Sequence, residues 1–404
     1  WTSSISWISW TRSARGADRV HPASWVQASE GTRAMRAVSI QRRVRSSAAL
    51  TLACGFVSTV SAQEYTCEVL YHLDAPSPIT VHSYKSVSAG GSCGDGWGPG
   101  TLGVPHAIYI PSSTGVPIDL HPLTGYTDTY ALACEGNQQV GYGWRDSSGY
   151  QAVMWAGSAA SLVNLHPGGY AVSEARGTDG EHQVGWAGTT VSTRAMLWSG
   201  SASSAVDLHP AGYTNSIAHH VWDGQQVGVA YVTGSISHAM LWTGSAASAV
   251  DLHPAGFSSS TSVGVRGMQQ VGSGSTPSGT RALLWHGTAA SAVDLHPAGH
   301  TRSVAAATNG TVQVGEATPT GGSFRACAWA GSADSFVSLH DFLPTGTVWS
   351  GSRAMSVDDD GVIYGFAFAA YSPGAPYRWA VRWTPVGGCA AKYNGDDEIG
   401  RAHV

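Results

Sequence analysis

Six histidines recur at a nearly fixed spacing and are the first residues whose chemistry needs an explanation. Each stands in a Leu-His-Pro or Leu-His-Asp step, 43 to 45 residues from the next: His121, His166, His209, His253, His296 and His340. Two imidazole nitrogens on one zinc ion must lie within roughly 4 Å of each other. Stacked sheets lie about 10 Å apart, so one histidine per repeat cannot converge on one ion. Because proline holds the preceding residue extended and starts a turn, we interpret the step as a turn device.

A tryptophan keeps the same period as the histidines. Its copies are Trp155, Trp198, Trp242, Trp285 and Trp329. Such a series is compatible with a ring of sugar-stacking side chains or with packing between neighbouring repeats. The chain is rich in Gly, Ser, Ala and Thr, and each tryptophan can bury about 150–250 Å². We therefore interpret the tryptophans as core residues.

Side chains that differ between the copies are the better ligand-binding candidates, because repeated positions build the scaffold. An aromatic or imidazole side chain follows each of five Leu-His-Pro steps, at Tyr126, Tyr170, Tyr213, Phe257 and His300. These five form the candidate binding surface on one face; the equally weighted alternative is that they cover the junctions between repeats. Arg176, His219 and Arg302 are not repeated and are candidates for lining a central channel. His219 and His220 are adjacent in a predicted strand, so we expect them to point to opposite faces.

The chain has no recognisable linear catalytic motif such as a nucleophile elbow, a zinc-binding His-Glu pair or a phosphate loop. Propeller glycosidases carry their carboxylates without a linear motif, so Glu135, Glu174 and Glu316 are the first candidates if the protein is an enzyme. Asp358-Asp-Asp-Gly361 stands at a hairpin position, and we interpret it as a solvated turn and not as a calcium site. We expect no metal and no cofactor.

The repeat between Val206 and Pro254 shows which elements position these side chains. It contains four strand-like runs, at 216–221, 226–230, 238–242 and 249–253. Asp223-Gly224 between the first two is a strong hairpin signal. Four short strands in about 44 residues match one blade of a propeller, and no helical period is sustained.

The number of copies predicts a closed ring. The third strand of the repeat occurs seven times, and the fourth strand follows six of these copies. The run Glu68–Asp74 precedes the first copy and supplies the missing fourth strand. We therefore predict an all-β fold, a β-propeller of seven four-stranded blades whose last blade is closed by the mature N-terminal strand.

The repeat resembles the bacterial HAF extracellular repeat, named for a His-Ala-Phe step before a tryptophan. The resemblance rests on His238-Ala-Met-Leu-Trp242, His106-Ala-Ile-Tyr109 and the Gln-Val-Gly step at 226–228, and it covers residues 84–384. Two features depart from that family: Met, Leu, Val or Cys replaces the phenylalanine, and Leu-His-Pro stands where a Leu-Gly turn is more common. The resemblance implies an exported propeller and no defined activity.

Both ends of the chain are predicted to lie outside the propeller, which we assign to residues 63–387. Residues 35–62 have the basic, apolar and small-residue regions of a secretory signal peptide. We interpret residues 1–34 as upstream, non-native translation and 398–404 as adapter-derived. Residues 388–397 resemble the truncated start of a dockerin-like or EF-hand loop, with Lys392 where the first calcium ligand belongs.

Charge and cysteine content limit the possible partners. Residues 1–62 hold eight arginines and two acids, so the remainder has 13 basic and 24 acidic residues, a net charge of −11. Sequence-independent nucleic-acid binding needs clustered basic residues and is not expected. Export implies an oxidising compartment in which disulfides are permitted. The pairing among five cysteines stays open: Cys67, Cys93, Cys134, Cys327 and Cys389.

These observations predict a secreted or cell-surface protein, with the periplasm as an alternative location and no membrane span. We expect a monomer that binds an extracellular glycan or protein through loops on one face, without catalysis. The first alternative is a carbohydrate-active hydrolase or lyase with carboxylates in the channel. The second is a purely structural repeat protein.

Overall fold

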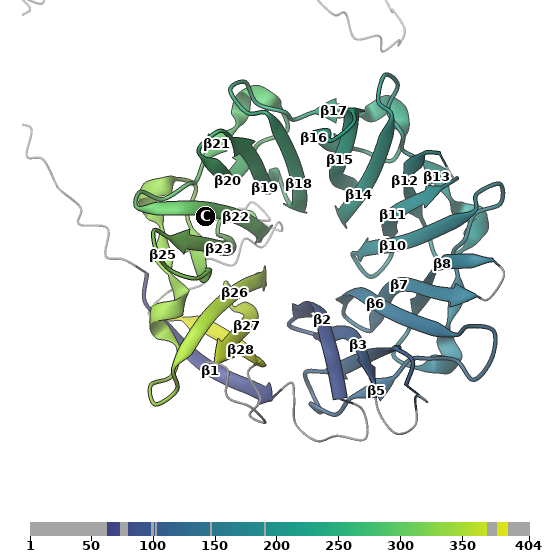
Figure 1. Ribbon diagram of the computed structural model, residues 1–404, viewed down its shortest axis with the longest axis horizontal. Helices are drawn as coiled ribbons and strands as arrows, with labels where there is room; N and C mark the ends of the chain where they lie inside the picture. Colours follow the sequence, from purple (N-terminus) through teal and green to yellow (C-terminus); the bar gives the residue numbers. More distant parts are fainter. Residues whose placement is uncertain are drawn as a thin grey trace, which may run out of the picture. The chain divides into compact units, whose positions relative to one another are not determined.

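A computed structural model describes the chain over residues 63–72, 80–97, 101, 103–145, 148–189, 191–369 and 378–386. Within these residues, seven four-stranded antiparallel sheets stand in a ring, so the protein is a seven-bladed β-propeller (Figure 1). The predicted fold class and blade number are confirmed. The segments assigned to upstream translation, signal peptide, dockerin-like start and adapter, namely 1–34, 35–62, 388–397 and 398–404, lie outside the described residues, as does Cys389.

The blades follow the chain, each from its inner to its outer strand. Blade 1 contains β2 (Thr80–Ser88), β3 (Gly91–Trp97), β4 (His106–Pro111) and β5 (Ile118–Asp119), and blade 2 contains β6 (Asp128–Glu135), β7 (Gln138–Arg145), β8 (Gly149–Trp155) and β9 (Val163–Asn164). Blade 3 contains β10 (Val172–Thr178), β11 (Gln183–Gly188), β12 (Thr193–Trp198) and β13 (Val206–Asp207), and blade 4 contains β14 (Asn215–Trp222), β15 (Gln225–Thr233), β16 (Ile236–Trp242) and β17 (Val250–Asp251). Blade 5 contains β18 (Ser259–Arg266), β19 (Gln269–Thr276), β20 (Gly279–Trp285) and β21 (Val293–Asp294), and blade 6 contains β22 (His300–Thr308), β23 (Gln313–Pro319), β24 (Arg325–Trp329) and β25 (Val337–Ser338). Blade 7 contains β26 (Trp349–Val357), β27 (Ile363–Ala369), β28 (Arg378–Pro385) and β1 (Tyr65–His72).

The outer strands of blades 1 to 6 are only two residues long, shorter than the predicted runs. In blade 4, the Asp251 carboxylate accepts the backbone N–H of His253 at 2.8 Å, which turns the chain out of the ladder. Short 3₁₀ turns precede the outer strands of blades 2 to 6, and a further one precedes blade 7: η1 (Ala159–Ser161), η2 (Ala202–Ser204), η3 (Ala246–Ser248), η4 (Ala289–Ser291), η5 (Ala333–Ser335) and η6 (Leu339–Phe342).

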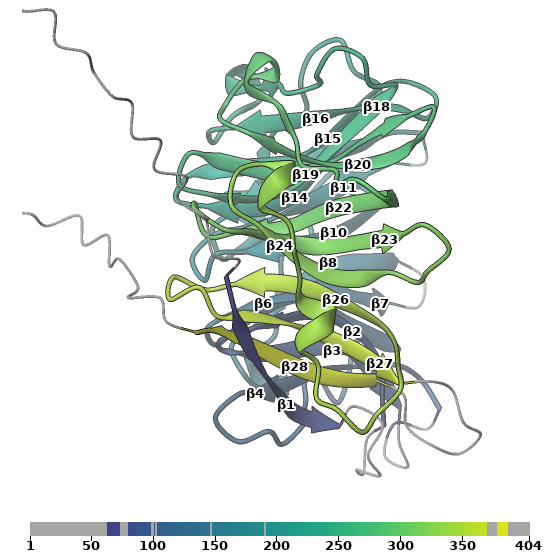
Figure 2. The same cartoon turned by 90° about the vertical axis from the view of Figure 1, so that its left-hand side faces the viewer.

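The ring is closed by strands from opposite ends of the chain. Strand β1 pairs with β28 in antiparallel register, from Tyr65 opposite Pro385 to His72 opposite Trp379 (Figure 2). Glu68 adds an ion pair with Arg382. The predicted closure is therefore confirmed, and β28 has a partner on both sides.

The periodic tryptophans fill the seams between blades. Trp242 packs in one buried cluster with Leu197 and Leu208 of the preceding blade, and its indole is 0% exposed. The equivalent rings are equally enclosed, at Trp155, Trp198, Trp285, Trp329 and Trp383. The core interpretation is confirmed, because a ring with no exposed surface has no face for a ligand.

Each inner strand carries a β-bulge at the same place in the repeat. In blade 4 the register shifts between Ala218 and His220, so His219 is the extra residue. The carbonyl oxygen of Ile217 then presses against Gly228 of the next strand, where an added Cβ would lie 2.0 Å from it. The equivalent glycine has this role in six blades. Five of these glycines end a Gln-Val-Gly step, namely Gly141, Gly185, Gly228, Gly272 and Gly315, and the sixth, Gly365, ends an Ile-Tyr-Gly step.

The periodic histidines join neighbouring blades. His209 Nδ1 lies 2.8 Å from Ser216 Oγ of the next inner strand, and that oxygen accepts the backbone N–H of Ala195 at 2.9 Å. His209 Nε2 lies 3.1 Å from the Tyr213 carbonyl oxygen, which can only accept, so Nε2 carries the proton of the neutral ring and donates it. Nδ1 is then an acceptor and receives the hydroxyl proton of Ser216. The turn interpretation was incomplete, because the same residue also fastens two blades together.

This histidine–hydroxyl–amide relay recurs in six seams. Its histidine and hydroxyl members are His121 with Thr129, His166 with Ser173, His209 with Ser216, His253 with Ser260, His296 with Ser303 and His340 with Ser352. Burial is the main cause that lowers the pKa of all six imidazoles, which keeps them neutral near pH 7.

Replacing Gly228 tests the bulge. We expect Gly228→Ala to lower the free energy of unfolding by about 1–3 kcal/mol, because the inner strand must move away from the new methyl group. The control is Gly168→Ala, at an exposed position where a Cβ meets no atom within 4 Å; we expect a change within about 0.5 kcal/mol. Denaturant unfolding measures both, and equal effects would contradict the role of the bulge.

Acid should loosen the seams. The unfolded chain has a histidine pKa of about 6.5, and burial lowers the pKa in the folded protein. Such a histidine therefore makes its full contribution to stability at pH values above about 6.5. As the pH falls below about 6.5, the unfolded chain takes up protons first and stability declines through the lowered folded pKa. We therefore expect the Tm to fall steadily from pH 7 to pH 5, and His209→Gln to weaken this slope. A Tm that is constant over this range would contradict the neutral relay.

Candidate functional site

A cavity of about 220 Å³ occupies the centre of the ring and is lined by the inner strands. The bulge residue of six blades contributes to its wall, at Leu132, Arg176, His219, Val263, Ala306 and Met355. A bulge re-aims the side chain of its extra residue. The structure thus exposes to the channel one repeat position at which the six copies all differ. Arg176 and His219 lie in the channel wall, where they were expected, whereas Arg302, the third channel candidate, is not among the residues that line this cavity.

The two adjacent histidines both line this cavity. The simple alternation on which the expectation of opposite faces rested does not hold here, because the bulge inserts His219 as an extra residue. Burial, followed by the nearby charge of Arg176, lowers the pKa of His219 to about 3. Burial lowers the pKa of His220 to about 4. Both rings are therefore neutral near pH 7. No three metal-binding side chains come together among the residues that the structure describes.

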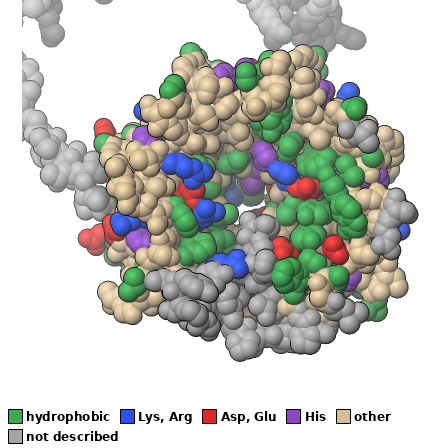
Figure 3. All heavy atoms as spheres, viewed as in Figure 1, with side chains coloured by type: hydrophobic (Ala, Val, Ile, Leu, Met, Phe, Trp, Pro, Cys, Tyr) green, Lys and Arg blue, Asp and Glu red, His purple; other side chains and the backbone are tan. Residues whose placement is uncertain are grey.

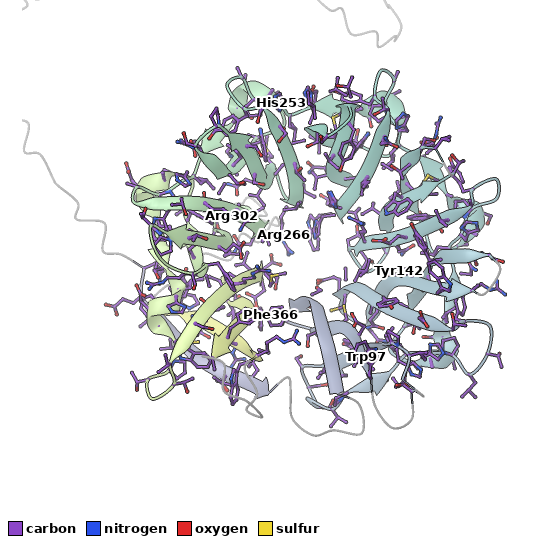
Figure 4. The ribbon with its side chains drawn as sticks, in the orientation of Figure 1. Trp97, Tyr142, His253, Arg266, Arg302 and Phe366 are labelled. Carbon is purple, nitrogen blue, oxygen red and sulfur yellow. The ribbon has the colours of Figure 1, made fainter. Side chains whose placement is uncertain are left out.

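Arg266 lies at the end of the channel that carries the hairpins after the inner strands. Its guanidinium lies over the Trp222 ring, 3.7 Å from the centroid, and forms an ion pair with Asp359 of blade 7. Figure 4 shows Arg266 beside the central opening. Glu135 is close by: burial raises its pKa, Arg266 lowers it, and Asp359 and Asp179 raise it. Arg266 thus links blade 5 to blade 7 across this end of the channel.

The turn beside Asp359 has the structure expected of a solvated hairpin. Asp358 Oδ1 accepts backbone N–H groups from Asp360 at 3.1 Å and Val362 at 2.8 Å. The carboxylate therefore serves the turn itself.

The three candidate catalytic carboxylates are not brought together. Only Glu135 lines the central cavity. Glu174 lies 2.7 Å from Arg176 Nε in an ion pair. Glu316 of blade 6 is held by Arg302 and by Arg353, whose Nε is 2.7 Å away, and its side chain is 12% exposed. Two of the three carboxylates are thus neutralised by arginines in different blades.

The predicted ring of aromatic and imidazole side chains covers the seams. All five members are half-buried. The Tyr213 hydroxyl donates to Asp251 at 2.9 Å, and Tyr126 accepts from Asn164 at 3.1 Å. Phe257 packs on Gly274, where a Cβ would lie 2.5 Å from the ring. Tyr170 packs against the core between blades 2 and 3, and His300 meets Phe336 edge-on at 5.0 Å. Of the two interpretations, the geometry supports junction cover.

A different aromatic cluster lies on the same face and was missed in the sequence. Tyr130 stacks on Tyr142 at 4.7 Å, and Tyr150 meets Tyr142 edge-on at 5.6 Å, Trp144 in a stack at 5.5 Å and Trp186 edge-on at 5.8 Å. We call these five residues of blades 2 and 3 the aromatic platform. Trp144 is 43% exposed. The sequence does contain a signal for the aromatic platform, which is a departure from the repeat: three other blades carry Ser, Glu or Val at the position of Tyr142.

The aromatic platform borders the channel on the face that carries the connections between blades. Tyr130 stands two residues before the bulge residue Leu132 of the same strand, and the Trp144 carbonyl accepts the backbone N–H of Thr127 in the connection at 2.8 Å. Trp97 holds the register position of Trp144 in blade 1 and is 41% exposed. Figure 3 shows hydrophobic side chains beside the central opening with charged groups among them, and Figure 4 shows Trp97 and Tyr142 on the same side of the ring.

Comparison with known proteins gives no family for this chain. No protein-family model matches the chain, and no curated protein matches it in sequence. Similar solved structures include the propeller domain of the Trilobed protease from Pyrococcus furiosus, with a TM-score of 0.49 and 9% identity over 80% of this chain and 98% of that one. A second is oligogalacturonate lyase from Vibrio parahaemolyticus, with a TM-score of 0.48 and 10% identity over 79% of this chain and 97% of that one. A third is puromycin hydrolase, with a TM-score of 0.46 and 15% identity over 73% of this chain and 52% of that one.

The chain spans about half the length of the puromycin hydrolase. At these identities and TM-scores the similarities assign no activity to this chain. Among the described residues, no helix is long and apolar enough to cross a membrane.

Two substitutions separate the forces that hold Arg266. We expect Arg266→Gln to lower the free energy of unfolding by about 1–2 kcal/mol, because the guanidinium stacks on Trp222 with its side chain 20% exposed. Asp359 is 75% exposed, so Asp359→Asn should cost less than about 1 kcal/mol. Denaturant unfolding of both variants measures this, and a larger loss for Asp359→Asn would show that the ion pair dominates.

Proposed function

We propose that this chain is an exported, non-catalytic β-propeller that binds a glycan on the aromatic platform beside the central channel. One observation carries the proposal: five contiguous aromatic rings interrupt the small-residue repeat on one face, and the outermost, Trp144, is 43% exposed. An export-type segment at 35–62 and the resemblance to an extracellular repeat support the location outside the cytoplasm.

A sugar matches this surface chemically. A pyranose presents a face of C–H groups that packs on an aromatic ring, while its hydroxyl groups need hydrogen-bonding partners at the edge. Charged groups lie near the platform: burial raises the pKa of Tyr130 and of Tyr142, and the buried carboxylate of Asp95 raises both further. Glu174 raises the pKa of Tyr150 and Arg176 lowers it, so this ion pair also lies next to the platform.

The carboxylates support binding rather than turnover. Hydrolysis by two carboxyl groups needs both to flank one glycosidic bond, at about 5–9.5 Å from each other. Here Glu174 and Glu316 are each paired with arginine, in blades 3 and 6, and Glu135 lies at the other end of the channel, near Arg266.

Substitutions in the aromatic platform test the proposal. With a glycan selected on an array, we expect Trp144→Ala and Tyr150→Ala to weaken binding at least about tenfold each, as the loss of a stacking ring costs roughly 1.4 kcal/mol or more. The matched control is Tyr231→Ala, because Tyr231 holds the register position of Trp144 in blade 4. Calorimetry measures the affinities, and equal losses in all three variants would contradict a site on the platform.

The same glycan decides between binding and catalysis. Incubation with the wild-type protein should release no product over hours. Product formation that disappears in Glu174→Gln or Glu135→Gln would overturn the non-catalytic proposal in favour of a hydrolase or lyase. Absence of binding to any array glycan, with no ligand-dependent shift of the Tm, would leave a structural repeat protein instead.

A further inference from the structure

Two cysteines occupy a pair of positions that the repeat brings together in the seams. One position is the valine of the Gln-Val-Gly step. The other lies in the inner strand of the next blade, three residues after the residue that pairs with that blade's own glycine, as Val221 follows Ala218, the partner of Gly228. The two positions share one buried cluster in three seams, as Val184 with Val221, Val227 with Val265 and Val314 with Val357. In the seam between blades 1 and 2, the same positions hold Cys93 and Cys134.

The two thiols are close to each other and shielded from solvent. Cys93 in β3 is 1% exposed, and Cys134 in β6 is 5% exposed. Cys134 Sγ lies 3.7 Å from the carbonyl oxygen of Gly91, two residues before Cys93. A hydrogen bond between the two thiol groups adds to burial in raising the pKa of Cys93. Their strands belong to adjacent blades, so a bond between them would join blade 1 to blade 2.

We propose that Cys93 and Cys134 form a disulfide bond when the protein folds in an oxidising compartment, and that this bond cross-links blades 1 and 2. The oxidant is a small-molecule or protein disulfide. One cysteine thiolate attacks it and gives a mixed disulfide with release of one thiol, and the second thiolate then displaces the other thiol. Two S–H bonds are lost and one S–S bond forms, while the oxidant gains the two electrons and two protons.

Burial sets the timing of this reaction. Thiol–disulfide exchange requires the thiolate and access to the reagent, and the folded seam provides neither. The bond therefore forms while blades 1 and 2 assemble, and once formed it resists reduction until the seam opens. Cys327, buried in blade 6, has no described cysteine within its core cluster and stays a thiol.

The test uses the full chain, refolded in a buffer of oxidised and reduced glutathione. The product is unfolded without reductant, alkylated and digested. We expect one cross-linked peptide containing Cys93 and Cys134, lacking two hydrogen atoms, and an alkylated Cys327. Alkylation of both Cys93 and Cys134, or a bond from either one to another cysteine, would overturn the proposal.

Reduction of the bond provides a second measurement. The bond closes a loop of about 40 residues, so the oxidised protein should have a Tm several degrees above the reduced one. The double variant Cys93→Val with Cys134→Val reproduces the valine pair of the other seams and should fold, with a Tm that no reductant changes. If the wild-type Tm is equally insensitive to complete reduction, no cross-link stabilises this seam. Glycan binding at the platform is a separate readout, so failure here leaves the proposed function untouched.

Discussion

The close contact between an inner-strand carbonyl and a glycine in the second strand of the same blade is the constraint on which the rest of the structure depends. An added Cβ at Gly185 or Gly228 would lie 1.9 or 2.0 Å from that oxygen, so no other residue fits. The contact accompanies the bulge, and the bulge provides one residue per inner strand whose side chain is re-aimed. Scaffold and site are therefore separated within one pair of strands: the glycine of the second strand must be constant, while the bulge residue of the inner strand is free to vary.

The seams add a second, polar constraint to the buried tryptophans. A serine or threonine of each following inner strand is saturated by one backbone amide and one imidazole, as Ser216 is by Ala195 and His209. Because a buried hydroxyl or amide left without a partner costs roughly 1–3 kcal/mol, the relay fixes the register between blades as well as their contact. Closure by β1 and β28 then holds seven such wedges in a ring.

The period of the sequence was sufficient for the blade count, the order of strands and the closure, because Trp and Leu-His-Pro mark the same point of each repeat. It was not sufficient for the site. A bulge has no signature at His219 or Leu132, since the extra residue differs in every copy and its only correlate is a distant glycine. The aromatic platform was missed because Tyr142 and Trp186 lie in second strands, whereas the aromatic residues of the connections were the conspicuous ones.

The proposed binding role agrees with the way the carboxylates around the channel are paired. A catalytic carboxyl group needs a proton affinity tuned to its task, which requires an environment that leaves it partly unpaired. Arg302 and Arg353 instead hold Glu316 from two strands, and Arg176 holds Glu174. Glu174 lies next to the aromatic platform and is fixed by Arg176, so its carboxylate has a constant geometry beside the rings. A fixed hydrogen-bond acceptor next to an apolar surface suits the polyhydroxylated ligand that we propose.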